Sequence, residues 1–333
     1  MNSTPPSNPN AAAVEPSRID VHAHYLPKHY REEVIAAGRG QPDGFPYLPD
    51  WSATQALEVM DRNGIATAML SISSPGVHFG DDAKARALSR SVNEDGARTV
   101  HDYPGRFGLF ASLPLPDVEG SLRELSYAMD VLHADGIVIE TNHHGIYPGD
   151  ARLDPVFEEL NRRKAVLFIH PTSPNCACCN QTLTMGYPAP LIEFLFETSR
   201  AVTNMILQGT LDRFPDIRLI IPHAGATLPL LLDRLVGTSV LLNLPSPLTS
   251  ERMAKLIRSL HFDVAGFPVP NQLKLLLEVA DHNKLLYGSD WPFTPEPVVS
   301  TLSQILDGTP LLKPTLLQRV LRDNALTLFP RLA

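Results

Sequence analysis

The sequence predicts an α/β protein that folds as a (β/α)8 barrel, the TIM-barrel architecture, in a single domain over residues 18–333. Eight short apolar runs alternate with segments of helical period along the chain. Right-handed crossovers return each helix to the outside of a parallel sheet, so eight such units favour a closed barrel. Several predicted strands also end in histidine or aspartate, as in barrels whose active sites lie at the carboxyl ends of their strands.

The predicted strands are short runs rich in β-branched and other apolar residues. They lie at RIDV (18–21), TAMLS (67–71), RFGLFA (106–111), GIVIE (136–140), AVLFIH (165–170), RLIIPH (218–223), LHFDV (260–264) and KLLYGS (284–289). An open, doubly wound sheet is the structural alternative. The first strand is not followed by a glycine-rich phosphate loop, and this favours the barrel.

Helices are predicted between these strands. In WSATQALEVMDRNG, Ser52 can cap the start of a helix and Gly64 can end it in a left-handed turn. The other predicted helices are 81–102, 119–133, 154–163, 190–212, 229–242, 270–282 and 312–327. The loops 40–50 and 171–190 follow predicted strands, so they are candidate lids over the catalytic face.

Composition excludes several classes of partner. The 333-residue chain is 44% hydrophobic and 19% charged, which is typical of a globular protein. Its net charge is −8 and its basic residues are scattered, so we expect no nucleic-acid partner. No uninterrupted apolar stretch approaches the roughly 20 residues of a membrane-spanning helix, so we expect no membrane insertion.

The N-terminus and the cysteines indicate a cytoplasmic location. Residues 1–17 lack the basic and apolar regions of a signal peptide and are predicted to form a disordered tail. Cys176, Cys178 and Cys179 lie together in NCACCN, which does not resemble a disulfide framework. A second metal or redox site is the weaker interpretation, because this cluster lacks a partner pair; loop thiols near the barrel mouth are expected.

Histidine and aspartate side chains follow four of the predicted strands. His22 and His24 follow the first strand, His170 ends the fifth, His223 ends the sixth, and Asp290 follows the eighth. In a parallel barrel these positions face one mouth, and residues i and i+2 of a strand share a face. A His-x-His pair is common by chance. Together with the other strand ends, however, it indicates a divalent metal site with an open coordination position.

The stretches DVHAH, FIHP, PHAGATLP and YGSDWPF, in this order, resemble the amidohydrolase superfamily. The likeness is greatest to the branch that contains aminocarboxymuconate-semialdehyde decarboxylase. It implies a barrel with one metal ion held by His22, His24, His170 and Asp290, and His223 beside the ion as an acid/base or water-orienting group. No lysine suited to carbamylation ends a predicted strand, so a single metal ion is expected.

The ligand set bears on the identity of the metal. Some aromatic-acid decarboxylases of this branch have a glutamate where this chain has His22. A histidine-rich set favours zinc, with manganese as the alternative, because carboxylate-rich sites accept manganese more readily. The stretches LPDWSATQALEVMDRNGI, ELNRRKAVLFIHP and RAVTNMILQGTLDRFP also resemble the group that acts on 6-methylsalicylate-like acids.

The resemblance also implies that Arg234 binds the substrate carboxylate across the interface of a homodimer. Arg234 lies in the apolar run LPLLLDRLVGTSVLL, which has more hydrophobic surface than a solvated outer helix usually shows. The alternatives are a surface ion pair of Arg234 with Asp233 or Glu251, and packing of the leucines on the strands.

Three further residues are candidates for contact with the substrate. Phe293, three residues after Asp290, matches an aromatic residue that lines the pocket in the resembled family, and ordinary core packing is its alternative. His143 and His144 follow the fourth strand on the catalytic side. We expect these two to be exposed loop histidines.

The expected function is metal-dependent, non-oxidative decarboxylation of a small, salicylate-like aromatic carboxylic acid. Such a site must anchor a carboxylate, stabilise carbanion-like charge and offer a proton, here from Asp290 or His223. The alternative is a hydrolase of a lactone, ester or amide, in which the metal lowers the pKa of bound water toward roughly 7. A non-catalytic metal- or ligand-binding barrel is more remote, because His223 and Asp290 are both intact.

Overall fold

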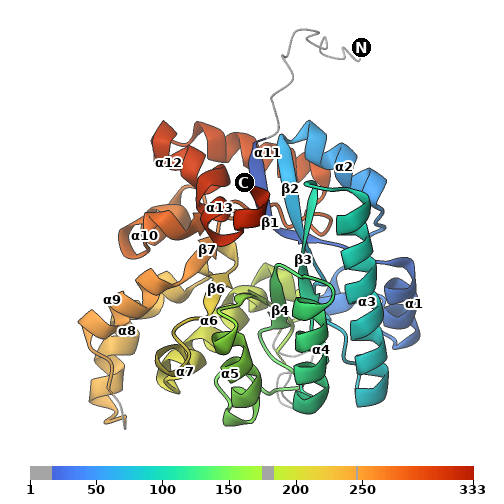
Figure 1. Ribbon diagram of the computed structural model, residues 1–333. Coiled ribbons are helices and arrows are strands. Elements are labelled where there is room, and N and C mark those ends of the chain that lie inside the picture. The colour runs from blue at the N-terminus through green and yellow to red at the C-terminus, as the bar shows by residue number, and fades with distance from the viewer. Residues whose placement is uncertain (1–16, 175–183, 245–246) are drawn as a thin grey trace.

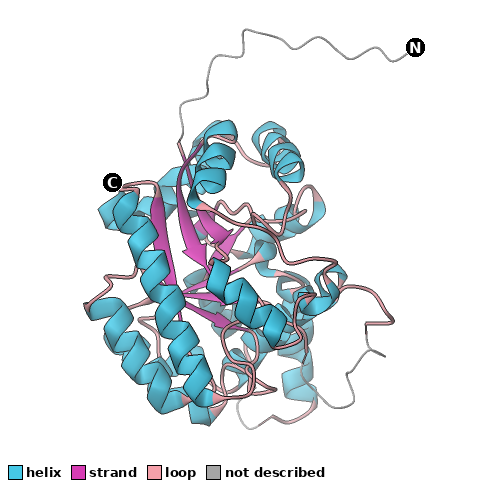
Figure 2. Ribbon diagram, turned by 90° about the vertical axis from the view of Figure 1, so that its right-hand side faces the viewer, coloured by secondary structure: helices cyan, strands magenta, loops and turns pink. Residues whose placement is uncertain are grey.

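Eight parallel strands form one sheet around the centre of the molecule, and helices cover its outer side (Figure 1, Figure 2). The computed structural model describes residues 17–174, 184–244 and 247–333. The strands are hydrogen-bonded in chain order from β1 to β8. A bridge between Asp20 and Tyr287 and the bond from Val21 N to Tyr287 O (2.9 Å) join the last strand to the first. The predicted barrel is confirmed.

Each predicted strand is present within a few residues of its expected position. The last three are shorter than predicted, because the chain turns into the barrel mouth soon after the sheet pairing ends. The bounds are β1 Arg18–His24, β2 Ile65–Ser71, β3 Phe107–Ser112, β4 Gly136–Glu140, β5 Val166–His170, β6 Arg218–Ile221, β7 His261–Asp263 and β8 Leu285–Leu286.

The helices agree less closely with the prediction. Ser52 caps its helix by accepting a hydrogen bond from Gln55 N, as expected. A continuous helix over 190–212 is wrong, because Gly209 (φ 69°) adopts a left-handed conformation that separates α6 from α7. Helices α1, α9 and α11 were not predicted. The bounds are α1 Lys28–Ala36, α2 Ala53–Arg62, α3 Asp82–Asp102, α4 Val118–Asp130, α5 Asp154–Arg162, α6 Glu193–Leu207, α7 Thr210–Arg213, α8 Leu228–Leu241, α9 Ser250–Ser259, α10 Asn271–Val279, α11 Glu296–Gly308, α12 Pro314–Gln318 and α13 Asn324–Leu328.

The inside of the barrel is a packed apolar core. The rings of Phe110 and Phe168 stack at its centre with their centroids 5.6 Å apart. Residues of α13 close the end of the barrel opposite the strand carboxyl ends, where the ring of Phe329 lies 5.8 Å from that of Phe110. The strand residues of this core are Ile19, Val21, Met69, Phe110, Val138, Val166, Phe168, Ile220 and Leu286. The core therefore forms a solid floor beneath the barrel mouth.

A bulge in β1 changes which side chains face the barrel interior. Asp20 pairs with Ala68 and Ala23 pairs with Leu70, so three steps along β1 match two steps along β2. The extra residue shifts the alternation of side chains, as β-bulges near active sites commonly do. Val21 belongs to the interior core, and the next residue, His22, also points inward, with its ring 4.9 Å from that of Phe168.

Within the described residues, His223–Leu241 is the one helical stretch that is long and apolar enough to cross a bilayer. The backbone is not continuous there, since Ala224 and Ala226 have φ values of 53° and 56°. Only the 14 residues of α8 form a regular helix. At about 1.5 Å per residue such a helix is shorter than the roughly 30 Å hydrocarbon core of a membrane. We therefore describe α8 as an outer helix of the barrel.

Candidate functional site

Four side chains from three separate parts of the barrel mouth converge on one point. His22 and His24 come from the end of β1, His170 ends β5, and Asp290 follows β8. One donor atom from each residue lies within 4.8 Å of the other three. The imidazoles are fully buried or nearly so, whereas the carboxylate of Asp290 is 20% exposed. These residues form a site for a divalent metal ion, open on the side of Asp290.

Each of the three imidazoles is held through its Nδ1 atom. His22 Nδ1 donates to Asp263 Oδ2 (2.9 Å), His24 Nδ1 to Ser71 Oγ (2.9 Å), and His170 Nδ1 to Pro171 O (2.8 Å). All three Nε2 atoms are therefore left to face the site. Outer hydrogen bonds of this kind fix the tautomer and the ring orientation of metal-ligating histidines. The donor set and its supports fit a divalent cation.

Asp263, at the end of β7, was not predicted to be a functional residue. Its side chain is fully buried, with Oδ2 on His22 and Oδ1 accepting from the backbone N–H groups of His223 (2.9 Å) and Ala265 (3.0 Å). One carboxylate thus positions a metal ligand and the backbone of the neighbouring histidine. The sequence signal was present, since LHFDV places an acidic residue inside an apolar run. Burying an unpaired carboxylate raises the free energy of the folded state, so a hydrogen-bond partner for this side chain was required.

Electrostatic interactions within the site favour a cation. Burial opposes the charged form of His22, but Asp263 and Asp290 outweigh it and raise the pKa of His22 to about 10. Burial, followed by the neighbouring His24 and His22, lowers the pKa of His170 well below its usual range. Burial would raise the pKa of Asp290, yet hydrogen bonds from His22, His223 and His24 hold it well below its ordinary value. A metal ion that binds here therefore displaces a proton from His22.

The backbone is strained at the two predicted catalytic residues. Asp290 has a φ of 59° and His223 a φ of 53°, a left-handed conformation that is uncommon outside glycine. Asp290 N donates to His22 O (2.7 Å), and Gln272 Nε2 donates to His223 O (2.6 Å). These bonds hold both residues in place. Strain of this kind often accompanies functional sites.

A cavity of about 570 Å³, which we call the metal chamber, opens beside the four ligands, and His170 and Asp290 are among its lining residues. Phe293 lies on its wall, with its ring 5.7 Å from that of His24 and 5.8 Å from that of Phe45. His223 also lines the chamber, and its Nε2 is 3.9 Å from Asp290 Oδ2. The remaining walls are largely apolar and include Leu191, Phe194, Leu195, Phe267 and Val298. The chamber can hold a small ring against the metal site.

Comparison with known proteins shows the family. The sequence profile of the amidohydrolases matches residues 19–331. The chain belongs to the amidohydrolase family. This amidohydrolase is 35% identical over 320 residues to the 6-methylsalicylic acid decarboxylase of Penicillium expansum, with 95% of this chain and 97% of the relative covered. It is 35% identical over 325 residues to decarboxylase yanB of Aspergillus niger, with 94% and 88% covered.

Solved structures agree with this assignment. A crystal structure of an amidohydrolase II superposes with a TM-score of 0.88 at 35% identity, covering 94% of this amidohydrolase and 100% of that chain. A dihydroxybenzoic acid decarboxylase of Polaromonas, solved with bound manganese, has a TM-score of 0.80 at 21% identity, with 94% and 97% covered. The similarity to the dihydroxybenzoic acid decarboxylase shows a shared fold. The predicted family membership is confirmed.

Arg234, which was predicted to bind the substrate, lies outside the metal chamber of its own chain. Arg234 is exposed on α8 and does not line the metal chamber. Among the described residues it forms no ion pair, so the expected alternative partners, Asp233 and Glu251, do not hold it.

His144 is exposed as expected, but exposure was the wrong prediction for His143, which packs under the loop after β4 and is 8% exposed. The three cysteines and residues 1–16 lie outside the described residues.

Metal content provides a direct check of the ligand set. Elemental analysis of the purified protein should find about one divalent ion per chain, because the described residues contain a single set of four donors. The double variant His22→Ala/His24→Ala should lose the ion. The matched variant His101→Ala/His133→Ala, altered at two exposed histidines, should keep it. Equal metal content in both double variants would contradict the assignment.

The variant Asp263→Asn tests whether the hydrogen bond from His22 Nδ1 to Asp263 contributes to metal binding. The amide cannot accept from both His22 Nδ1 and the two backbone N–H groups, so we expect the metal dissociation constant to rise by about 10- to 100-fold. Competition with a chromophoric chelator measures this constant. The control is Asp102→Asn, because Asp102 is half exposed and lies far from the site in sequence. If the metal dissociation constant of Asp263→Asn were unchanged, Asp263 would not be needed to position His22.

Proposed function

We propose that this amidohydrolase is a metal-dependent, non-oxidative decarboxylase of a small, salicylate-like aromatic acid. The observation that carries the proposal is the metal chamber, in which an apolar cavity of about 570 Å³ lies beside three imidazoles and a carboxylate. Relatives 34–36% identical over 84–95% of the chain are named decarboxylases, and two of them act on 6-methylsalicylic acid. Ring, carboxylate and metal can therefore meet in one place.

The residues of the chain supply binding and proton transfer. Phe45 and Phe293 offer aromatic edges, and Leu191 and Leu195 an apolar surface, for a flat ring. A divalent ion, when bound, provides positive charge for the substrate's carboxylate and ortho hydroxyl and for charge that develops during reaction. The walls of the chamber limit the access of water to that charge, which strengthens the electrostatic stabilisation.

Proton transfer falls to Asp290 and His223. Their side chains face each other across 3.9 Å at the edge of the metal chamber, and both are partly exposed to it. In the proposed reaction, a proton held between these two side chains passes to the ring carbon that bears the carboxylate. The bond from that carbon to the carboxylate then breaks, its electron pair restores the aromatic ring, and carbon dioxide leaves. The overall reaction exchanges carbon dioxide for a proton and needs no oxidant.

We propose zinc as the metal, with manganese as the alternative. Three imidazoles and one carboxylate form a nitrogen-rich set that suits zinc, whereas oxygen-rich sets suit manganese. The dihydroxybenzoic acid decarboxylase of similar fold was solved with manganese, which supports testing both ions.

The reaction can be tested with a panel of acids and lactones. The protein, loaded with zinc or manganese, should release carbon dioxide from 6-methylsalicylate or a related hydroxybenzoate and should leave lactones and esters intact. Chelation of the metal should abolish release. Acid release from lactones without carbon dioxide from any hydroxybenzoate would replace the decarboxylase with a hydrolase, and inactivity on the whole panel would favour a binding barrel.

Asp290→Asn and His223→Asn separate proton transfer from metal binding. Asp290→Asn should reduce kcat by about 100-fold or more, the usual contribution of a positioned acid or base, while three imidazoles still hold the ion. His223→Asn should act similarly with normal metal content. Turnover and metal content are measured on the same samples. If either variant turned over at the wild-type rate, the proposed catalytic role of that residue would be wrong.

We further propose a homodimer in which Arg234 serves the partner's metal chamber. None of the described residues that line this chamber is a lysine or an arginine, so they offer a substrate carboxylate no ammonium or guanidinium group. Arg234 is exposed, and the same helix also exposes Leu230 (73%), Val240 (57%) and Leu241 (76%). Exposed apolar surface beside an unpaired cation supports an interface rather than a solvated helix.

Subunit exchange tests the shared site. A mixture of inactive His223→Asn chains with Arg234→Ala chains should recover about one quarter of wild-type activity, because half of the dimers are mixed and each holds one intact site. A mixture of His223→Asn with Asp290→Asn is the matched control, since both lesions lie in the chain's own chamber. Absence of recovery despite proven exchange, or a monomer by light scattering, would overturn the proposal.

A further inference from the structure

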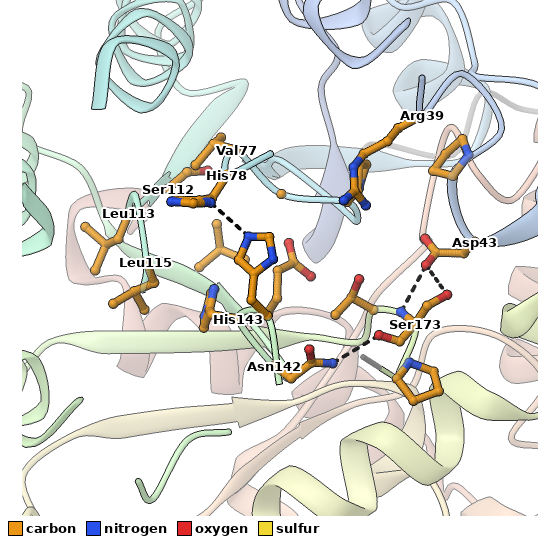
Figure 3. A pocket seen from close by; sticks show the side chains of 18 of the residues that line it. Arg39, Asp43, Val77, His78, Ser112, Leu113, Leu115, Asn142, His143 and Ser173 are labelled. Carbon is orange, nitrogen blue, oxygen red and sulfur yellow. Dashed lines mark hydrogen bonds between the residues drawn. The ribbon is translucent and has the colours of Figure 1, made fainter. Parts of the chain in front are cut away.

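A second cavity, of about 350 Å³, lies beside the metal chamber over the carboxyl ends of β2 to β5 (Figure 3). We call it the second chamber. Its boundary with the metal chamber is built by the loops after β1, β2 and β5. Asp43 Oδ1 accepts from Ser173 N (2.9 Å) and Ser173 Oγ (2.6 Å), and the hydroxyls of Ser74 and Thr172 lie 2.7 Å apart. Asp43 lines both cavities, whereas the metal ligands His170 and Asp290 line only the metal chamber.

Two buried polar atoms in the second chamber form no hydrogen bond with a described residue, although Glu140 Oε2 lies 3.7 Å from Nδ1 of the metal ligand His170. Glu140 Oε2 and His143 Nε2 form no hydrogen bond within the part of the chain that the structure describes. Glu140 is 7% exposed and His143 is 8% exposed. Because buried polar groups in folded proteins are nearly always hydrogen-bonded, two such atoms at one cavity indicate a polar group that a ligand supplies. A hydroxyl fits both, since it donates and accepts and so suits either protonation state of each residue.

Arg39 supplies positive charge to the same chamber. Figure 3 shows its side chain entering from the side of Asp43, across the cavity from His143. Arg39 is exposed and forms no ion pair with a described residue. The carboxylate of Asp43 is turned away into its two bonds with Ser173. His78 and His144 are bonded to each other (2.8 Å), and Arg39 is the one lysine or arginine among the described residues that line the chamber.

The far side of the second chamber is apolar. Val77, Leu113 and Leu115 line it, and all three are at least 95% buried. Burial and the adjacent His144 and His78 lower the pKa of His143 to about 3, so this residue adds no charge to the cavity at neutral pH. The lining thus matches a molecule with one carboxylate, one hydroxyl and a short hydrocarbon part.

We propose that the second chamber binds a small hydroxylated monocarboxylic acid. Its carboxylate accepts from the guanidinium of Arg39, its hydroxyl meets Glu140 Oε2 or His143 Nε2, and its hydrocarbon part packs on Leu113 and Leu115. The ligand is not decarboxylated there, because the metal ligands His170 and Asp290 line only the metal chamber. Such an acid can be an aromatic acid of the substrate type or an aliphatic hydroxy acid, and both share the chemistry that the chamber recognises.

Calorimetric titration of the metal-loaded, full-length protein tests the site with two probes. The probes are 3-hydroxybenzoate, which lacks the ortho hydroxyl, and 3-hydroxybutyrate. At least one should bind with a Kd below about 1 mM, and Arg39→Met should weaken that binding by about tenfold or more, the usual effect of losing a charge-assisted hydrogen bond. Arg98→Met, at an exposed arginine of α3, is the matched control and should change the Kd by less than about twofold.

The possible results distinguish an aromatic ligand from an aliphatic one. Arg39-dependent binding of 3-hydroxybenzoate alone assigns the site to aromatic acids, and binding of 3-hydroxybutyrate alone assigns it to aliphatic ones. Failure of both probes to bind, or equal affinities in Arg39→Met and Arg98→Met, overturns the proposal. Thermal unfolding and metal content of each variant verify that the fold is retained. Since binding is measured without turnover, the result does not depend on the proposed decarboxylation.

Discussion

The hydrogen bond between the Asp263 carboxylate and His22 Nδ1 is the interaction on which the organisation of the metal centre depends. It joins β7 to β1 across the barrel mouth, with both side chains fully buried. The other oxygen of the same carboxylate holds the backbone of His223. Because the bond lies in a low-dielectric interior and includes a charged group, it is stronger than a bond of the same geometry at the surface. The ligand ring, the adjacent histidine and the floor below them therefore form one rigid unit.

The barrel mouth concentrates unusual backbone conformations as well as unusual side chains. Asp43, His144, His223 and Asp290 all have left-handed φ values; Asp43 lines both chambers, and each of the others lines one. Conformations of this kind cost on the order of 1–3 kcal/mol each, so they persist only where the surroundings determine them. Here the backbone bond from Asp290 to His22 and the two bonds from Ser173 to Asp43 do so. The apolar core below stabilises the barrel against this strain.

The sequence was informative where a residue's position follows from the barrel itself. Eight apolar runs identified the strands, and the strand ends brought His22, His24, His170 and Asp290 to one mouth. Asp263 was missed because a buried carboxylate has the same sequence signal as any polar residue in a strand. The bulge in β1 has no composition signal, since it arises from the pairing of two strands. The two chambers also escaped prediction, because the contact between Asp43 and Ser173 joins loops 130 positions apart.

The closed floor of the barrel has a consequence for biosynthesis. Ala325, Leu328 and Phe329 complete the interior core that β1 begins. A chain emerges from the ribosome with its N-terminus first, so the contact between the last strand and the first cannot form before β8 has been synthesised, and the floor cannot form before α13. Until then the inward faces of the early strands have no cover. The nascent chain thus carries exposed strand edges until these segments have been synthesised, and shielding by chaperones matters most in that interval.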